Sequence, residues 1–149
     1  MEKEKLSPQD LVLYYKSDVQ KLLRYVPYLH GKKADDVSSL YESEGAMSFP
    51  VYDGTLLSFV KEAQQTVFMD RNYRYIYTRQ NIKDHQDELK KIEQATILDM
   101  EILNGIMSKY VLGGMTKGTL WSEAVEWGIF YHILTKAQEL ITFWDEPIK

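Results

Sequence analysis

The sequence predicts an all-α fold: a single domain spanning residues 1–149, with five to seven helices around a hydrophobic C-terminal helix. Apolar residues recur at spacings of three and four in most segments, which is typical of amphipathic helices. No internal repeat and no alternation of strands with helices is found. A length of 149 residues and an apolar content of 44% are ordinary for one globular domain.

The first helix is predicted to begin at Ser7-Pro8, because proline at the first helical position loses no hydrogen bond. Ser17 and Gln20 also fit a capping box, which predicts a break near Lys16. A second break is expected beside Pro27, which disfavours helical geometry in the preceding residue. The apolar positions are Val12, Tyr15, Val19, Leu22, Leu23 and Val26.

Residues 31–54 are weakly patterned and rich in turn formers and mixed charge. A short helix is expected around Asp36–Tyr41. The flanking segments are too short for separate cores, so no domain boundary is placed here.

Four further helices are expected downstream. Their starts are marked by residues whose side chains cap helices well, and glycines mark the end of the third by accepting a left-handed conformation. The starts are Asp53 (to Val67), Asp84, Thr96 (to Gly113-Gly114) and Thr119 (to about Phe143). The last of these is apolar nearly all round, as expected of a helix covered by its neighbours.

Composition excludes several classes of protein. Without cysteine there are no disulfides, thiolate catalysis or cysteine-based zinc sites. No apolar leader and no apolar run of roughly 18–20 residues is found, so we expect a cytoplasmic protein without a membrane span. The net charge is −4, although residues 71–91 carry six basic and three acidic side chains. A clearly basic balance, the usual mark of DNA-binding domains, is missing.

Residues 72–80, NYRYIYTRQ, allow three interpretations. Alternating tyrosines favour a strand, but no second alternating run follows to pair with it. Tyrosines beside arginines also stack on single-stranded nucleic acid, yet no sustained basic groove surrounds them. We therefore expect a helix or an extended corner that packs its tyrosines on the core.

Three phrases resemble a family of small bacterial proteins classed as a domain of unknown function. They are SFPVYDGTLLSFV (48–60), MDRNYRYIYTR (69–79) and SKYVLGGMTKGTLWSEAVEWGIF (108–130). The resemblance covers most of the chain and implies a small, helical, cytoplasmic protein. It supplies no activity and no catalytic residues.

The loop GGMTKGT (113–119) partly matches a phosphate-binding loop. In that motif the lysine follows the last glycine, whereas Lys117 precedes Gly118, and the preceding segment is a predicted helix. A corner between two helices is therefore expected, with a weak anion site at Lys117 as the alternative.

Carboxylates on the last predicted helix are the other candidates. Glu123 and Glu126 share a face, but His132 lies about 120° away, so no metal site is expected. Glu126 sits inside the apolar run AVEWGIF, where a carboxylate needs a partner, and Arg74 or Arg79 is the expected one. His85 and Glu88 are three residues apart, a spacing that suits two ligands of one metal ion. They lie in the highly charged stretch DHQDE, however, so a solvated helix face is expected.

The sequence therefore favours a protein-interaction or regulatory module acting through a Tyr- and Trp-rich surface, binding another protein or itself. The alternative is a small enzyme or ligand-binding protein, with a pocket lined by Glu126, Arg74, Arg79 and Tyr77. Weak nucleic-acid binding is a third and less favoured interpretation. No strong catalytic motif is present, and no cofactor is expected.

Overall fold

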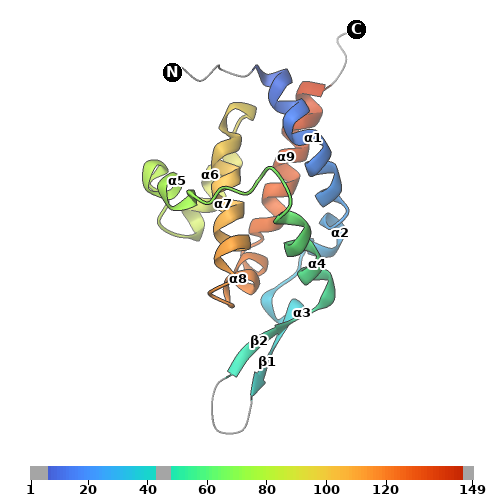
Figure 1. The fold of residues 1–149 in the computed structure, drawn as a ribbon, viewed down its shortest axis with the longest axis vertical. Coiled ribbons are helices and arrows are strands. Elements are labelled where there is room, and N and C mark those ends of the chain that lie inside the picture. The colour runs from blue at the N-terminus through green and yellow to red at the C-terminus, as the bar shows by residue number, and fades with distance from the viewer. Residues whose placement is uncertain (1–6, 43–47, 146–149) are drawn as a thin grey trace.

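The all-α fold is confirmed by the computed structural model, which describes residues 7–42 and 48–145 (Figure 1). These residues form nine α-helices, one 3-10 turn and one two-stranded antiparallel sheet. Helices outnumber the expected five to seven because α2 and α3 are single turns and the C-terminal helix is broken in two. Within the described ranges, no helix is long and apolar enough to cross a bilayer.

The described elements include nine helices, one 3-10 turn and two strands. In order they are α1 (Pro8–Leu23), α2 (Val26–Leu29), α3 (Ala34–Val37), β1 (Ser38–Glu42), β2 (Ser48–Tyr52), α4 (Gly54–Ala63), α5 (Tyr73–Gln80), α6 (His85–Gln94), η1 (Ile97–Asp99), α7 (Met100–Gly113), α8 (Leu120–Glu126) and α9 (Ile129–Asp145).

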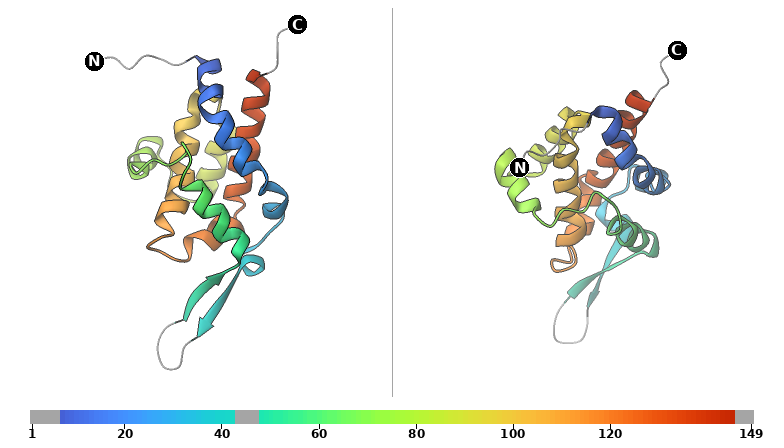
Figure 2. Two further views of the ribbon diagram at one scale, coloured as in Figure 1. Left: turned by 45° about the vertical axis from the view of Figure 1, so that its right-hand side comes forward. Right: turned by 45° about the horizontal axis from the view of Figure 1, so that its top comes forward.

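Helices α7 and α9 form the centre of the bundle. Helix α1 runs beside α9, α5 packs on α7, and α6 contacts both α7 and α9 (Figures 1 and 2). Both central helices are therefore covered on several sides, as expected for the apolar C-terminal segment. Helix α9 buries Ile129, Phe130, Ile133, Leu134, Ala137 and Ile141; α7 buries Met100, Leu103, Ile106, Met107, Tyr110 and Val111.

The predicted helix starts are confirmed where a side chain caps the helix. Ser7 forms a capping box with Asp10 at α1, while Asp53 and Asp84 accept from backbone N–H groups at the starts of α4 and α6. The break expected near Lys16 is wrong, because α1 runs unbroken from Pro8 to Leu23. Its buried stripe continues past that point, and tertiary packing outweighs the local capping signal.

The long C-terminal helix expected from Thr119 to Phe143 is also wrong. Helix α8 ends at Glu126 and α9 begins at Ile129, with Gly128 between them at φ +68°. Glycine takes this left-handed conformation without the steric cost that other residues bear. The break changes which faces of α8 and α9 point to the core. A prediction that treats both segments as one continuous helix therefore assigns residues of α8 to the wrong face.

The predicted end of α7 is confirmed, but for a different reason. Gly114 has φ −67°, so it does not adopt a left-handed cap. A Cβ added at Gly114 would clash with the Trp121 ring. Glycine is therefore needed because α8 folds back closely on the end of α7.

The β1–β2 hairpin was not predicted. The short helix expected at Asp36–Tyr41 ends at Val37, and β1 begins at Ser38. The strands pair antiparallel from Ser38 opposite Tyr52 to Glu42 opposite Ser48, and the hairpin projects from the helices (Figure 1). In a sheet of two strands both are edges, which tolerates Pro50 in β2.

Helix α5 packs against α7 at Gly105, where α7 has no side chain. A Cβ added at Gly105 would lie 2.8–3.0 Å from three side-chain carbons of Ile76, including its Cβ. Ile76 is the buried residue of α5. This close approach holds α5 against α7 at Ile76.

We predict that Gly105→Ala lowers the free energy of unfolding by about 1 kcal/mol. Overpacking typically costs about 1–3 kcal/mol, and the better helix propensity of alanine returns about 1 kcal/mol. Urea unfolding measures the change. Gly54→Ala is the control, since nothing lies within 4 Å of its added Cβ. Equal effects of the two substitutions would show that the α5–α7 approach is not tight.

Candidate functional site

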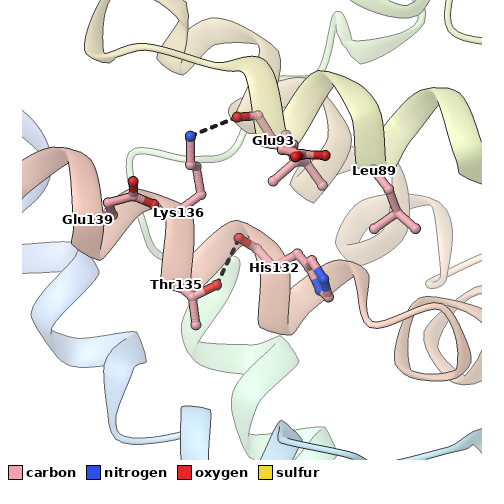
Figure 3. A pocket seen from close by; sticks show the side chains of 7 residues that line it. Leu89, Glu93, His132, Thr135, Lys136 and Glu139 are labelled. Carbon is pink, nitrogen blue, oxygen red and sulfur yellow. Dashed lines mark hydrogen bonds between the residues drawn. The ribbon is translucent and has the colours of Figure 1, made fainter.

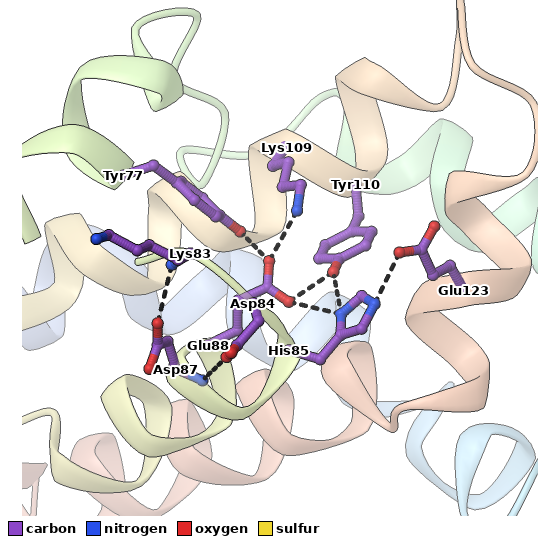
Figure 4. A network of polar contacts seen from close by, with 9 residues as sticks. All are labelled: Tyr77, Lys83, Asp84, His85, Asp87, Glu88, Lys109, Tyr110 and Glu123. Atoms are coloured by element: carbon purple, nitrogen blue, oxygen red, sulfur yellow. Dashed lines mark hydrogen bonds and ion pairs between the residues drawn. The ribbon is translucent and has the colours of Figure 1, made fainter. Parts of the chain in front are cut away.

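A fully buried carboxylate, that of Glu88, lies where α5, α6 and α7 meet (Figure 4). Four side chains contact its two oxygens. Oε2 accepts from the Tyr77 hydroxyl (2.5 Å) and the Lys109 ammonium (3.1 Å). Oε1 accepts from the Tyr110 hydroxyl (2.6 Å) and lies 3.0 Å from His85 Nδ1. We call Glu88 with these four side chains and Glu123 the Glu88 hub.

Helix α6 places Glu88 and His85 together. Asp84 caps the helix by accepting from the Asp87 N–H, and the two hub residues follow in its first turns (Figure 4). Their separation of three residues puts both on one face. The helix dipole also favours a negative charge near this end.

Helices α5 and α7 supply the remaining donors to Glu88. Tyr77 comes from α5, while Lys109 and Tyr110 are consecutive on α7. The Lys109 ammonium lies 5.0 Å from the centre of the Tyr77 ring and 4.8 Å from that of Tyr110. Cation–π attraction therefore adds to the ion pair with Glu88 and holds all three side chains in one arrangement.

His85 connects the buried carboxylate to α8. Its Nδ1 faces Glu88, its Nε2 lies 2.7 Å from Glu123 Oε1, and its ring stacks on Trp127 at 4.6 Å between centres. A ring that faces a carboxylate with each nitrogen donates to both only when it carries both protons. The Tyr110 hydroxyl also lies 2.9 Å from His85 Nδ1, so the ring contacts both α7 and α8.

The hub controls the protonation of its own members. Burial raises the pKa of Glu88, but donation from Tyr110, Tyr77, Lys109 and His85 outweighs it, and the net pKa lies below the ordinary value. Burial raises the pKa of the Tyr77 and Tyr110 hydroxyls strongly, and the negative charge of Glu88 and the hydrogen bonds to it raise them further. Both tyrosines are therefore fixed as donors and Glu88 as the acceptor.

This arrangement positions side chains rather than presenting a free base. Each oxygen of Glu88 has two partners, and both nitrogens of His85 face carboxylates. In the part of the chain that the structure describes, no three His, Asp or Glu side chains are grouped to hold a metal ion. What the hub fixes most directly is the placement of Tyr77 and Lys109.

Those two side chains also line a pocket of about 430 Å³ between α5, α7 and the α7–α8 corner. The lining combines three cations with two tyrosine rings, a hydroxyl and a leucine, and it contains no carboxylate. Glu88 forms an ion pair with Lys109 but is not itself part of the pocket lining. We call this the cationic pocket; its residues are Tyr73, Arg74, Tyr77, Thr78, Lys109, Lys117 and Leu120.

The structure brings some predicted site residues together. Arg74, Tyr77 and Lys117 line the cationic pocket. Of the two forms expected for residues 72–80, a helix or an extended corner, the structure has the helix, but Tyr75 is exposed and does not pack on the core. Glu123 lies in the hub, where its partner is His85. Arg79 is exposed on α5 and does not line the pocket.

The expectation for Glu126 is wrong. Its side chain is 46% exposed, and it accepts from the Ala34 N–H at 3.0 Å and pairs with Lys33 at 3.9 Å, not with Arg74 or Arg79. The helix break at Gly128 explains the error, because AVEWGIF is shared between two helices. Glu126 therefore anchors α3 to α8 and lies outside the cationic pocket.

The solvated face expected for His85 and Glu88 is also wrong, since Glu88 is completely buried. Charged neighbours in DHQDE favour solvent, but three of the four side chains that contact the Glu88 carboxylate come from α5 and α7. Lys109 and Tyr110 were missed for the same reason. One weak signal for the burial of Glu88 was present in the sequence. Glu88 lies one helical turn before Ile92, so it shares a face of α6 with a buried apolar residue.

A separate groove between α6 and α9 is more mixed in charge (Figure 3). Lys136 crosses it and donates to the Glu93 carbonyl oxygen at 2.7 Å, in the last turn of α6. A lysine at a helix C-terminus satisfies an unpaired carbonyl and complements the dipole. This contact joins two helices and needs no ligand.

Comparison of the chain with protein-family models, curated proteins and solved structures gives no significant match.

We predict that Glu88→Gln lowers the free energy of unfolding by about 3 kcal/mol, because removing one partner of a buried ion pair leaves the others unsatisfied. Chemical denaturation measures the loss. Glu93→Gln, an exposed position on the same helix, is the control and changes stability little.

The depressed pKa of Glu88 also predicts how stability depends on pH. Glu88 stabilises the fold fully above about pH 4.3, and this contribution is lost as the pH falls towards the pKa of Glu88 in the folded protein.

If Glu88→Gln is no less stable than Glu93→Gln, or if its stability falls as steeply below pH 4.3 as that of the natural chain, the hub does not hold an ionised Glu88.

A second prediction concerns alkaline pH. Below about pH 10 the hub tyrosines are protonated in both folded and unfolded chains, so their contribution is complete. Above it the unfolded chain loses protons that the folded chain retains, and stability falls by up to about 1.4 kcal/mol per pH unit for each such tyrosine. Tyr77→Phe therefore shows a shallower fall between pH 10 and 11. A slope equal to that of the natural chain would place Tyr77 outside the hub.

Proposed function

We propose that the protein binds a small anionic ligand in the cationic pocket. The observation that carries this proposal is the convergence of Arg74, Lys109 and Lys117 on one cavity without a carboxylate on its lining. Like charges repel, so three cations gathered from separate segments favour a site completed by an anion. The pocket volume of about 430 Å³ falls within the range usual for small-molecule sites, about 300–1,000 Å³.

The rigidity of the pocket wall supports the same function. Tyr77 and Lys109 are both held by Glu88, and Lys109 is also held between two rings. Side chains fixed before binding lose little conformational freedom when a ligand arrives. The wall is therefore organised in advance, while Arg74 and Lys117 are exposed and free to close over the ligand.

A protein-interaction surface is the second candidate. Leu13 and Tyr14 on α1 and Phe143 on α9 are 74%, 56% and 71% exposed, and these two helices lie side by side. Large exposed apolar side chains on neighbouring elements suit a protein partner or a second copy of the chain. This interaction, and a cytoplasmic location, stay predictions.

The ligand proposal is tested by titrating the protein with phenyl phosphate, phenyl sulfate and benzoate at low ionic strength. Calorimetry measures affinity, and amide shifts in NMR spectra locate the site. We expect at least one anion to bind, with shifts confined to α5, the end of α7 and the α7–α8 corner. Arg74→Gln and Lys117→Gln each weaken binding by about tenfold, since each removes a charge-assisted hydrogen bond.

Arg79→Gln is the matched control, because Arg79 is an exposed arginine of the same helix outside the pocket. It removes the same charge from α5 and leaves affinity unchanged. Binding of none of the three anions at millimolar concentration, or equal weakening by Arg79→Gln, would overturn the proposal.

A further inference from the structure

The charge of the pocket lining indicates how much charge its ligand carries. Lys109 is compensated, because its ammonium lies 3.1 Å from Glu88 Oε2. Arg74 and Lys117 have no carboxylate within ion-pair distance among the described residues. The lining therefore holds two uncompensated positive charges, and a ligand head with two negative charges would neutralise it.

The donors of the lining suit a phosphate group. The planar guanidinium of Arg74 can donate two parallel hydrogen bonds to one phosphoryl group, and Lys117 adds a point charge. The Thr78 hydroxyl donates to the Arg74 carbonyl oxygen at 3.0 Å, so its proton is already used and the donors left for the ligand are the two cationic side chains. A phosphate monoester carries about −1.5 to −2 charges at pH 7, while a carboxylate or sulfate ester carries one.

The rest of the lining suits an organic ring. Tyr73, Tyr77 and Leu120 contribute two aromatic rings and an aliphatic side chain. Because the Tyr77 hydroxyl donates to Glu88, this side chain offers its ring, and not its hydroxyl, to a ligand. Planar groups stack on such rings. Inorganic phosphate would leave this part of the cavity unfilled.

We infer that the ligand is a phosphate monoester of a planar ring, with its dianionic head between Arg74 and Lys117 and its ring on Tyr73, Tyr77 and Leu120. This inference rests on the proposed function and narrows it to one class of ligand.

The test compares phenyl phosphate with phenyl sulfate at pH 8, where both have the same shape but the first carries two charges and the second one. Inorganic phosphate is the third probe and supplies the head without the ring. We expect phenyl phosphate to bind at least tenfold more tightly than either. In the double variant Arg74→Gln/Lys117→Gln, the ratio between phenyl phosphate and phenyl sulfate falls to about one.

The matched variant Arg79→Gln keeps the full ratio, and thermal unfolding confirms that all variants are folded. Equal affinity for phenyl phosphate and phenyl sulfate would overturn the dianion inference while leaving the anion pocket in place. Equal affinity for phenyl phosphate and inorganic phosphate would contradict the inference that the ligand carries a planar ring. Loss of all binding would instead contradict the proposed function.

Discussion

The arrangement of α5, α6 and α7 depends on satisfying one buried carboxylate. Removing a charge from water costs several kcal/mol, and the cost is offset only when the charge is paired and hydrogen-bonded with good geometry. Glu88 meets this condition with donors from its own helix and from two others. Any shift of α5 away from α7 would break the Tyr77 contact. The close approach of Ile76 to Gly105 is therefore what allows Glu88 to be buried.

The same constraint shapes the pocket. Tyr77 and Lys109 face Glu88 with their polar atoms and line the pocket as well, so the carboxylate fixes one wall without being exposed in it. It neutralises Lys109 but neither Arg74 nor Lys117, which determines the charge left for a ligand. His85 extends the network to Glu123 on α8, and the start of α8 forms the edge of the pocket. The side chains that stabilise the fold around Glu88 therefore include two that line the proposed binding pocket.

Local patterns predicted much of the fold, whereas tertiary pairing decided the site. Helical spacing and the caps at Ser7, Asp53 and Asp84 depend on residues close in sequence, and they predicted the fold class and three helix starts. The hairpin and the break at Gly128 lack such a signal. Local charge and composition predicted Arg74 and Tyr77 as pocket residues, and the GGMTKGT loop predicted Lys117 as a separate anion site; all three line one pocket, whereas Glu126 and Arg79 do not.

Glu88 departs from what its local sequence predicts. Its neighbours in sequence are charged, so the local pattern favours solvent, while its hydroxyl and ammonium donors lie 11 to 22 residues away in the chain. Glu126 shows the opposite error, since its neighbours are apolar but a helix break exposes it. Burial of a carboxylate depends on partners that a single helix does not reveal.

The central claim is that Glu88 is ionised inside the protein and held so by its donors. Carbon-13 NMR of glutamate side-chain carboxyls, with Glu88 assigned by the Glu88→Gln variant, measures this directly as pH is lowered. The account predicts that the Glu88 carboxyl titrates below about pH 4.3, the usual glutamate value. A carboxyl that takes up its proton above that value would mean that burial outweighs the donors, and would contradict the account.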